Sequence, residues 1–303
     1  MATAHASEQR KGVLLVAAAA LLWSSGGLFI KLAPMPGLAV AFGRSAVTSV
    51  FYLIVLRPKL SKASWSTAFA YAAMILTFVT ATKLTTSANA IFLQYTGPAY
   101  VLMLSPWILR ERLKRIDVAC VVISLVGMSL FFLGRVEAGQ LAGNLLGAAS
   151  GLFFGVTVLL LRRDAAGGKS GGDAMPSTAL GNILAAVVAL PFAAHSLGAA
   201  LTPLGAVSLL YLGVVQLGVA YLLFAKGLKR VPASEASLVS MLEPVFNPLW
   251  VFLGTGERPG PWALLGGGIV IGAVVVRALW REPAAGLGAA AETPVRGPET
   301  TSR

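Results

Sequence analysis

Residues 88–112 read ANAIFLQYTGPAYVLMLSPWILRER, and residues 234–258 read SEASLVSMLEPVFNPLWVFLGTGER. Each stretch is mostly apolar, holds a proline inside it (Pro98 or Pro244) and ends on a Glu-Arg pair. Because proline lacks a backbone N–H and clashes with the preceding turn, it kinks or interrupts a helix. The two stretches therefore predict two equivalent interrupted helices, one in each half of the chain.

The composition predicts a membrane protein. Of the 303 residues, 56% are hydrophobic and 12% are charged, whereas an ordinary soluble domain carries about 25% charged residues. Lipid is the simplest solvent for so much apolar surface, so a lipid bilayer is the expected environment. The net charge of +12 is spread over short clusters between apolar runs, as in membrane loops. We therefore expect no nucleic-acid partner.

Ten apolar runs approach the roughly 20 residues that a membrane-spanning helix needs. They cover residues 13–31, 38–56, 66–82, 88–109, 117–134, 142–161, 177–194, 204–224, 233–253 and 262–280. We predict an all-α membrane protein with ten transmembrane helices. Its predicted parts are a cytoplasmic N-terminal tail (1–11), a first repeat (12–135), a second repeat (142–281) and a disordered cytoplasmic C-terminal tail (282–303).

The basic residues predict the orientation of the helices. If the N-terminus is cytoplasmic, the Lys and Arg clusters at 57–62, 110–115 and 226–230 all fall in cytoplasmic loops, and the external loops carry few basic residues. This asymmetry follows the positive-inside rule. It predicts a multi-pass protein of the bacterial inner (plasma) membrane with both termini cytoplasmic.

An odd number of spans in each half implies inversion. Two equivalent five-helix halves of one chain must lie upside down relative to each other, and the charges place the Glu111 loop inside and the Glu257 loop outside. The prediction is therefore two inverted five-helix repeats, a recurring plan of secondary transporters. The alternative is a duplication retained for stability alone.

Several short motifs occur in order along the chain. They are Leu22-Trp23-Ser24-Ser25-Gly26-Gly27, Arg44, Leu93-Gln94-Tyr95-Thr96-Gly97-Pro98, Glu111-Arg112, Leu242-Glu243-Pro244-Val245-Phe246 and Gly256-Glu257. With them, residues 12–281 resemble the EamA-type family of the drug/metabolite transporter (DMT) superfamily. The resemblance implies ten helices in two inverted halves, a central cavity and alternating access, and the family includes exporters of amino acids and other metabolites. Pro248 departs from the aliphatic residues more usual near the end of the ninth span.

Pro98, Pro244, Glu111 and Glu257 are candidate helix-break or gating residues. Interruptions at corresponding places in two halves point to a transporter's binding site, because carbonyls freed at bilayer depth are tolerated where they face a cavity. The alternative is a pair of packing kinks. The two glutamates end the interrupted spans and are expected to fix loops or form gates.

Glu243 lies near the middle of the ninth span, where a charged side chain costs at least ~2.5 kcal/mol on insertion scales. Ser240 and Asn247 share its helical face, because residues three and four apart are neighbours on a helix. This stripe is a candidate substrate site, with Glu243 as a candidate proton carrier; a structural hydrogen bond is the alternative. Glu235 is expected to form an ion pair at the cytoplasmic surface.

Arg44 lies near the external start of the second span. It can attract an anionic substrate, pair with a carboxylate such as Glu243, or extend to the membrane surface. Aromatic walls with a few polar groups suit an amphipathic ligand, although aromatic residues in spans also serve packing. The further candidate substrate contacts are Trp23, Ser24, Asn89, Gln94, Tyr95 and Tyr221.

Glycines spaced by four predict close helix crossings. They are Gly147, Gly151, Gly155, Gly268 and Gly272. Such a face can also join two copies of the chain, so the protein is predicted to be a monomer or a homodimer.

These features favour a secondary transporter of small organic molecules, amino acids or related metabolites, that works by alternating access and exports them. We expect no metal and no cofactor, because Cys120, His5 and His195 are isolated and no complete nucleotide-binding motif is present. An enzyme is disfavoured because Glu235 and Glu243 have no histidine nearby. The alternative on the same fold is a membrane sensor or assembly protein without transport.

Overall fold

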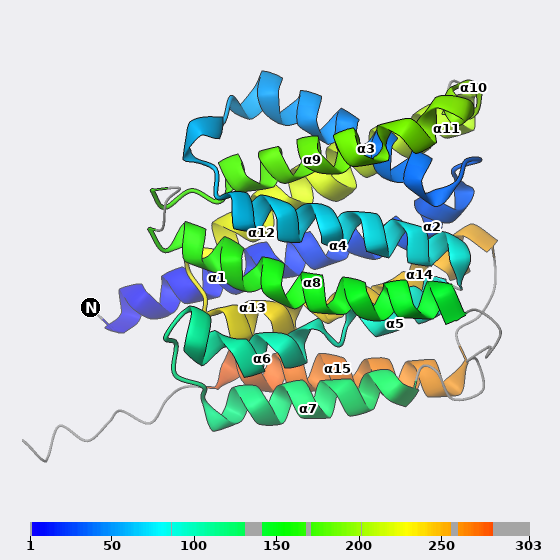
Figure 1. Cartoon of the computed structure of the whole chain (residues 1–303). Coiled ribbons are helices and arrows are strands. Elements are labelled where there is room, and N and C mark those ends of the chain that lie inside the picture. Colours follow the sequence, from blue (N-terminus) through cyan, green and yellow to red (C-terminus); the bar gives the residue numbers. More distant parts are fainter. Residues whose placement is uncertain are drawn as a thin grey trace, which may run out of the picture.

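The computed structural model describes residues 2–85, 87–130, 141–167, 171–200, 202–255 and 260–280, and this part of the chain is all-helical. The long helices lie side by side along one common direction (Figure 1). The first half contains α1 (Ala2–Ser24), α2 (Gly26–Leu32), α3 (Gly37–Phe51), η1 (Tyr52–Leu56), η2 (Leu60–Lys62), α4 (Trp65–Leu84), α5 (Ser87–Gln94), α6 (Gly97–Ile108) and α7 (Arg115–Leu130). The second half contains α8 (Leu141–Ala165), α9 (Met175–Ala193), η3 (Ala194–Ser196), α10 (Leu197–Ala200), α11 (Pro203–Leu210), η4 (Tyr211–Val219), α12 (Ala220–Leu228), α13 (Ala233–Ser240), α14 (Leu242–Thr255) and α15 (Pro261–Leu279).

Six helical stretches in the described part are long and apolar enough to cross a membrane. They are Ser7–Leu32, Gly37–Leu56, Trp65–Leu84, Leu141–Ala165, Met175–Ser196 and Pro203–Leu228. They correspond to the first, second, third, sixth, seventh and eighth of the predicted spans. This finding agrees with the predicted membrane-protein class. Large apolar side chains such as Phe69, Met103 and Trp107 are also exposed on the outside of the bundle, as lipid-facing residues would be.

The fourth and ninth predicted spans are each divided into two short helices. In the fourth, α5 ends at Gln94 and α6 begins at Gly97; in the ninth, α13 ends at Ser240 and α14 begins at Leu242. In both cases the proline stands in the first turn of the second helix, where its missing N–H is tolerated. The fifth and tenth spans are single helices, α7 and α15.

One end of the bundle is rich in basic residues. The start of α1 and the connections α3–α4, α6–α7 and α12–α13 lie at the same end (Figure 1). These connections carry Arg57, Lys59, Lys62, Arg110, Arg112, Lys114, Lys229 and Arg230. We call this the basic end and the other the opposite end. The residues predicted as an N-terminal tail are helical from Ala2 onward and continuous with α1, whereas the predicted C-terminal tail lies outside the described residues.

Glycines on α8 bring it against both pieces of the interrupted fourth span. A side chain at Gly151 would lie 2.5 Å from the carbonyl oxygen of Leu93, and one at Gly155 would lie 2.8 Å from that of Gly97. The predicted close crossing at these positions is therefore confirmed. The same prediction for Gly268 and Gly272 is wrong, because a Cβ at either position meets nothing within 4 Å.

Candidate functional site

The two helix breaks meet in the middle of the bundle. A helix would normally pair the carbonyl of Ser240 with the N–H of residue 244, and Pro244 has none. The Tyr95 hydroxyl, which lies in the other break, donates a hydrogen bond to that carbonyl at 2.8 Å. The freed carbonyl of one half is thus satisfied by a side chain of the other half. The prolines do more than bend their helices, because they create this contact.

A small cavity lies beside the two breaks. Its walls come from both halves of the chain: Trp23, Arg44, Met74, Ile75, Phe78, Gln94, Phe154, Gln216, Leu217, Tyr221 and Glu243. The space left for water-sized molecules is about 30 Å³, which is room for about one or two waters. Five of the predicted substrate contacts line it together: Trp23, Arg44, Gln94, Tyr221 and Glu243.

Arg44 is the buried cation of this cavity. Its side chain is only 2% exposed, so it does not reach the membrane surface. Its Nε and Nη1 atoms have no hydrogen-bond partner, and no ion pair of Arg44 occurs among the described residues. An unpaired buried charge is strongly unfavourable. Arg44 is therefore well placed to receive an anionic group that enters the cavity.

Glu243 is the carboxyl group of the same cavity. It lies in the first turn of α14, is buried, and its Oε2 atom accepts a hydrogen bond from the Tyr95 hydroxyl at 2.6 Å. The Tyr95 side chain is 1% exposed and is not one of the residues that line the cavity. In this structure, therefore, Tyr95 holds a cavity carboxyl group in place.

Two further wall residues have unused hydrogen-bonding groups. The Nε1 atom of Trp23, a donor, and the Oε1 atom of Gln216, an acceptor, have no partner. Buried polar groups are normally hydrogen-bonded, so unpaired ones need an explanation. With Arg44, they supply three donor atoms and one acceptor to any ligand in the cavity.

The rest of the wall is apolar and partly aromatic. The Trp23 and Tyr221 rings lie 4.8 Å apart, and Tyr71 packs edge-on against Tyr221 at 4.7 Å. The Phe224 ring extends this cluster and lies 5.0 Å from Trp23 and 6.2 Å from Tyr221. Such a wall suits the apolar body of a ligand whose polar groups face Arg44 and Glu243.

Four predicted substrate contacts lie elsewhere. Ser24 accepts a hydrogen bond from the Trp250 indole at 2.7 Å, and Asn89 lies 3.4 Å from the Thr85 hydroxyl near the opposite end. Ser240 bonds back to its own helix and is separated from Glu243 by the break at Met241. Glu243 and Asn247 lie in one helix, α14, and both are buried; a substrate role of the Ser240-Glu243-Asn247 face stays a prediction.

Gln216 is the polar wall residue that the sequence analysis missed. It lies in η4, a π-helical segment whose carbonyls accept hydrogen bonds from α3 and η1. The Thr48 hydroxyl of α3 lies 2.8 Å from the Gly213 carbonyl, and the Tyr52 hydroxyl of η1 lies 3.0 Å from that of Gly218. A lone amide in an apolar run was the available signal. The π-helical conformation had no signal in the sequence, because the hydrogen bonds to its carbonyls come from the other half of the chain.

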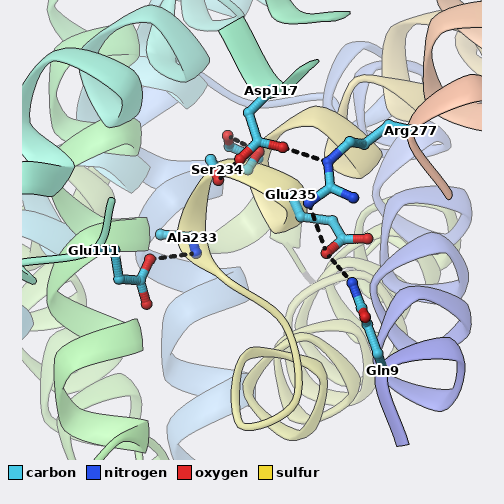
Figure 2. Close-up of polar contacts among 8 residues, drawn as sticks. Gln9, Glu111, Asp117, Ala233, Ser234, Glu235 and Arg277 are labelled. Atoms are coloured by element: carbon cyan, nitrogen blue, oxygen red, sulfur yellow. Dashed lines mark hydrogen bonds and ion pairs between the residues drawn. The ribbon is translucent and has the colours of Figure 1, made fainter. Parts of the chain in front are cut away.

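A network of buried charges closes the basic end. Arg277 on α15 pairs with Asp117 on α7 and, at 3.4 Å, with Glu235 on α13 (Figure 2). Gln9 on α1 donates to Glu235 at 2.8 Å, and Ser234 donates to Asp117 at 2.9 Å. Glu235 forms an ion pair, as expected, but the expected surface location is wrong: its side chain is 1% exposed, because α13 packs against α1 and α15.

Glu111 joins α8 to the start of α13. Its Oε1 atom pairs with Arg162 Nε at 2.9 Å, and its Oε2 atom accepts the N–H of Ala233 at 3.2 Å (Figure 2). This contact fixes a loop, as expected for Glu111. Its predicted counterpart Glu257 lies outside the described residues.

The family model for EamA-like transporters matches residues 10–133 and, a second time, residues 141–278. The chain belongs to this family, which is part of the DMT superfamily. The family resemblance found in the sequence is therefore confirmed. Membership points to a membrane transporter and away from an enzyme.

The relatives are transporters by name. The uncharacterized transporter YwfM of Bacillus subtilis (strain 168) is 26% identical over 286 residues, which cover 89% of this chain and 94% of YwfM. The uncharacterized transporter YxxF of the same organism is 27% identical over 183 residues, covering 58% of this chain and 57% of YxxF. An uncharacterized transporter of Archaeoglobus fulgidus is 26% identical over 208 residues, covering 69% of this chain and 72% of that protein.

A solved crystal structure has the same fold. It superposes with a TM-score of 0.67 at 19% sequence identity, covering 88% of this chain and 96% of the other. At this identity the likeness concerns the fold alone.

Proposed function

We propose that this protein is a secondary transporter that exports small organic molecules, amino acids or related metabolites, across the bacterial inner membrane by alternating access. The observation that carries the proposal is the cavity at the two helix breaks, in which a buried cation, a carboxyl group and unpaired hydrogen-bonding groups face one space. Interrupted helices at the interface of two halves are where transporters bind their substrates.

The helix contacts support two inverted halves of five spans each. α4 packs against α8, and the pair that corresponds to it after exchange of the halves, α12 and α1, is also in contact. In the same way, α4 packs against α9, and the corresponding η4 packs against α3. The broken span α5–α6 lies on α8, and the broken span α13–α14 lies on α1. Every contact between the halves named here has its counterpart when the halves are exchanged. Two equivalent halves require this relation, and an odd number of spans in each half makes the two halves inverted.

The charge distribution supports cytoplasmic termini. Positively charged loops stay on the cytoplasmic side, and the basic end holds the start of α1 together with the connections that carry Arg57, Arg110 and Lys229. With this orientation the network of Arg277 closes the cytoplasmic end.

The size of the cavity supports a conformational cycle. A site for a small organic molecule usually measures some hundreds of Å³, whereas about 30 Å³ is open here. Loading a substrate therefore requires the helices around the breaks to move. The breaks at residues 95–96 and 241 provide the points about which the short helices can shift.

The test is an efflux assay in proteoliposomes. The purified protein is reconstituted and loaded with a panel of amino acids, carboxylates and amines, with and without a pH gradient. We expect flux of at least one compound and its loss in the Arg44→Gln variant. The matched control is Arg163→Gln, which changes a partly exposed arginine that bonds Ser66 outside the cavity. Binding of compounds without flux would favour a sensor and contradict the proposal.

A further inference from the structure

The cavity contains a basic and an acidic side chain that do not form a direct ion pair with each other. Arg44 has free Nε and Nη1 atoms, and the described ion pairs include none between Arg44 and Glu243. Both side chains nevertheless line one small space, each less than 10% exposed. In such a medium of low dielectric constant, the charge state of one group depends strongly on the other. A ligand that neutralises one of them therefore affects the second.

The hydrogen bonds of Tyr95 accommodate a protonated Glu243. A tyrosine hydroxyl has one proton to donate, yet two oxygens lie within bonding distance, the Ser240 carbonyl at 2.8 Å and Glu243 Oε2 at 2.6 Å. If Glu243 is ionised, it competes with the carbonyl for that proton. If Glu243 is protonated, its O–H donates to Tyr95 and the Tyr95 hydroxyl donates to Ser240, so that both bonds form.

We propose that Glu243 takes up a proton when an anionic ligand binds at Arg44, so that a carboxylate and a proton occupy the cavity together, whereas a zwitterion binds without the proton. The inference rests on the proposed transport function and deepens it. An anion removes the positive charge that balances an ionised Glu243, and protonation restores neutrality. A zwitterion brings its own ammonium group to Glu243, which then stays ionised.

The surroundings of Glu243 leave Arg44 as the charged group able to act on it. The other titratable groups around it are the phenols of Tyr95, Tyr71 and Tyr221. The charged side chains on the helices packed against α14 lie toward the ends of the bundle, outside the cavity wall. They are Glu8, Arg10, Lys11, Lys31, Glu235 and Arg277.

Binding and proton uptake are measured on the purified wild-type protein in detergent. The probes are 3-phenylpropionate and L-phenylalanine, which share a carboxylate and an aromatic body and differ in the ammonium group. Calorimetry in two buffers of different ionisation enthalpy counts the protons. We expect uptake approaching one proton per 3-phenylpropionate bound and none with L-phenylalanine. The affinity for 3-phenylpropionate should rise as the pH falls, by up to about tenfold per pH unit.

Two variants separate the roles of the charges. Glu243→Gln should bind 3-phenylpropionate without proton uptake or pH dependence and should lose affinity for L-phenylalanine, and Arg44→Gln should lose affinity for both. If a variant does not fold, the proton count on the wild-type protein decides. Uptake of no proton with 3-phenylpropionate, equal uptake with both probes, or no binding of either would overturn the inference.

Flux distinguishes this inference from the proposed function. Transport of either probe in proteoliposomes without proton-linked binding would overturn the inference and leave the transporter intact. Proton-linked binding without any flux would support the inference about the site and contradict the transport function.

Discussion

The two helix breaks, at residues 95–96 and at residue 241, divide corresponding spans of the two halves and have different surroundings. In the first, Pro98 deprives the Gln94 carbonyl of its helical donor, and the backbone of α8 packs closely beside it at Gly151. In the second, Pro244 frees the Ser240 carbonyl, which bonds Tyr95, and the next turn presents Glu243 to the cavity. The first break packs against α8 and contributes Gln94 and Tyr95 to the site, whereas the second contributes its carboxyl group.

The first helices of the same two spans, α13 and α5, also differ in the polar contacts near their starts. At the start of α13, Glu235 joins a buried ion network with Arg277. At the equivalent position near the start of α5, Asn89 lies beside Thr85, which bonds Asn144. The start of α13 is thus held by an ion network of three charged side chains, whereas at the start of α5 the Thr85 carbonyl accepts a hydrogen bond from the Lys31 ammonium at 2.9 Å. The two halves share the arrangement of a broken span and differ in the polar residues that it carries.

The largest effect should come from breaking the ion network. Arg277→Gln leaves Asp117 and Glu235 buried without their cation, and removing one partner from a buried pair costs about 3–5 kcal/mol. The melting temperature of the purified protein should fall strongly. The control is Arg230→Gln at the exposed pair with Glu8, which should melt close to wild type. Equal melting of the two variants would show that the network contributes little.

The packing role of the first break is tested by Gly151→Ala. Its Cβ would overlap Thr96 Oγ1 and the Leu93 carbonyl, and overpacking typically destabilises by about 1–3 kcal/mol. Gly268→Ala is the matched control, since nothing lies within 4 Å of that Cβ; it should be neutral or slightly stabilising. If the denaturation midpoints of both variants equal that of the wild type, close packing at Gly151 does not stabilise the protein.

The contact between the two breaks is tested by Tyr95→Phe. Loss of the hydroxyl leaves the Ser240 carbonyl without its donor, which costs about 1–2 kcal/mol, and frees Glu243 from its fixed position. Thermal stability should fall modestly, and flux should fall with it. Tyr100→Phe, on the same span but partly exposed, is the control and should change neither measurement.

The smallest expected effect is the difference in transport rate between the Pro244→Ala and Pro98→Ala variants. Pro244→Ala returns an N–H that competes with Tyr95 for the Ser240 carbonyl, so transport should slow about fivefold, as ~1 kcal/mol implies. Pro98→Ala should slow it by less than about twofold, because no side-chain bond at that break is replaced. Initial rates in proteoliposomes give the ratio. A larger effect at Pro98 would reverse the assignment of the two breaks.

Much of the site was predictable from single residues. Arg44 and Glu243 stand out because charged side chains inside apolar runs are costly and therefore functional or paired. Pro98 and Pro244 mark the breaks through their chemistry alone. By contrast, the Arg277 network was not predictable, because Asp117, Glu235 and Arg277 lie at the ends of three different spans and each resembles an ordinary interfacial charge.

The amino-acid sequence by itself determined the helical membrane class, the prolines that divide two spans and the few polar residues available to a site. These properties follow from local chemistry: apolar length, a missing N–H, a charge among aliphatic side chains. Only the tertiary structure decided that Tyr95 holds Glu243, that Gln216 reaches the cavity and that Glu235 is buried against Arg277. Each of these contacts joins residues far apart in the chain, and the packing of helices, not the spacing of residues, brings them together.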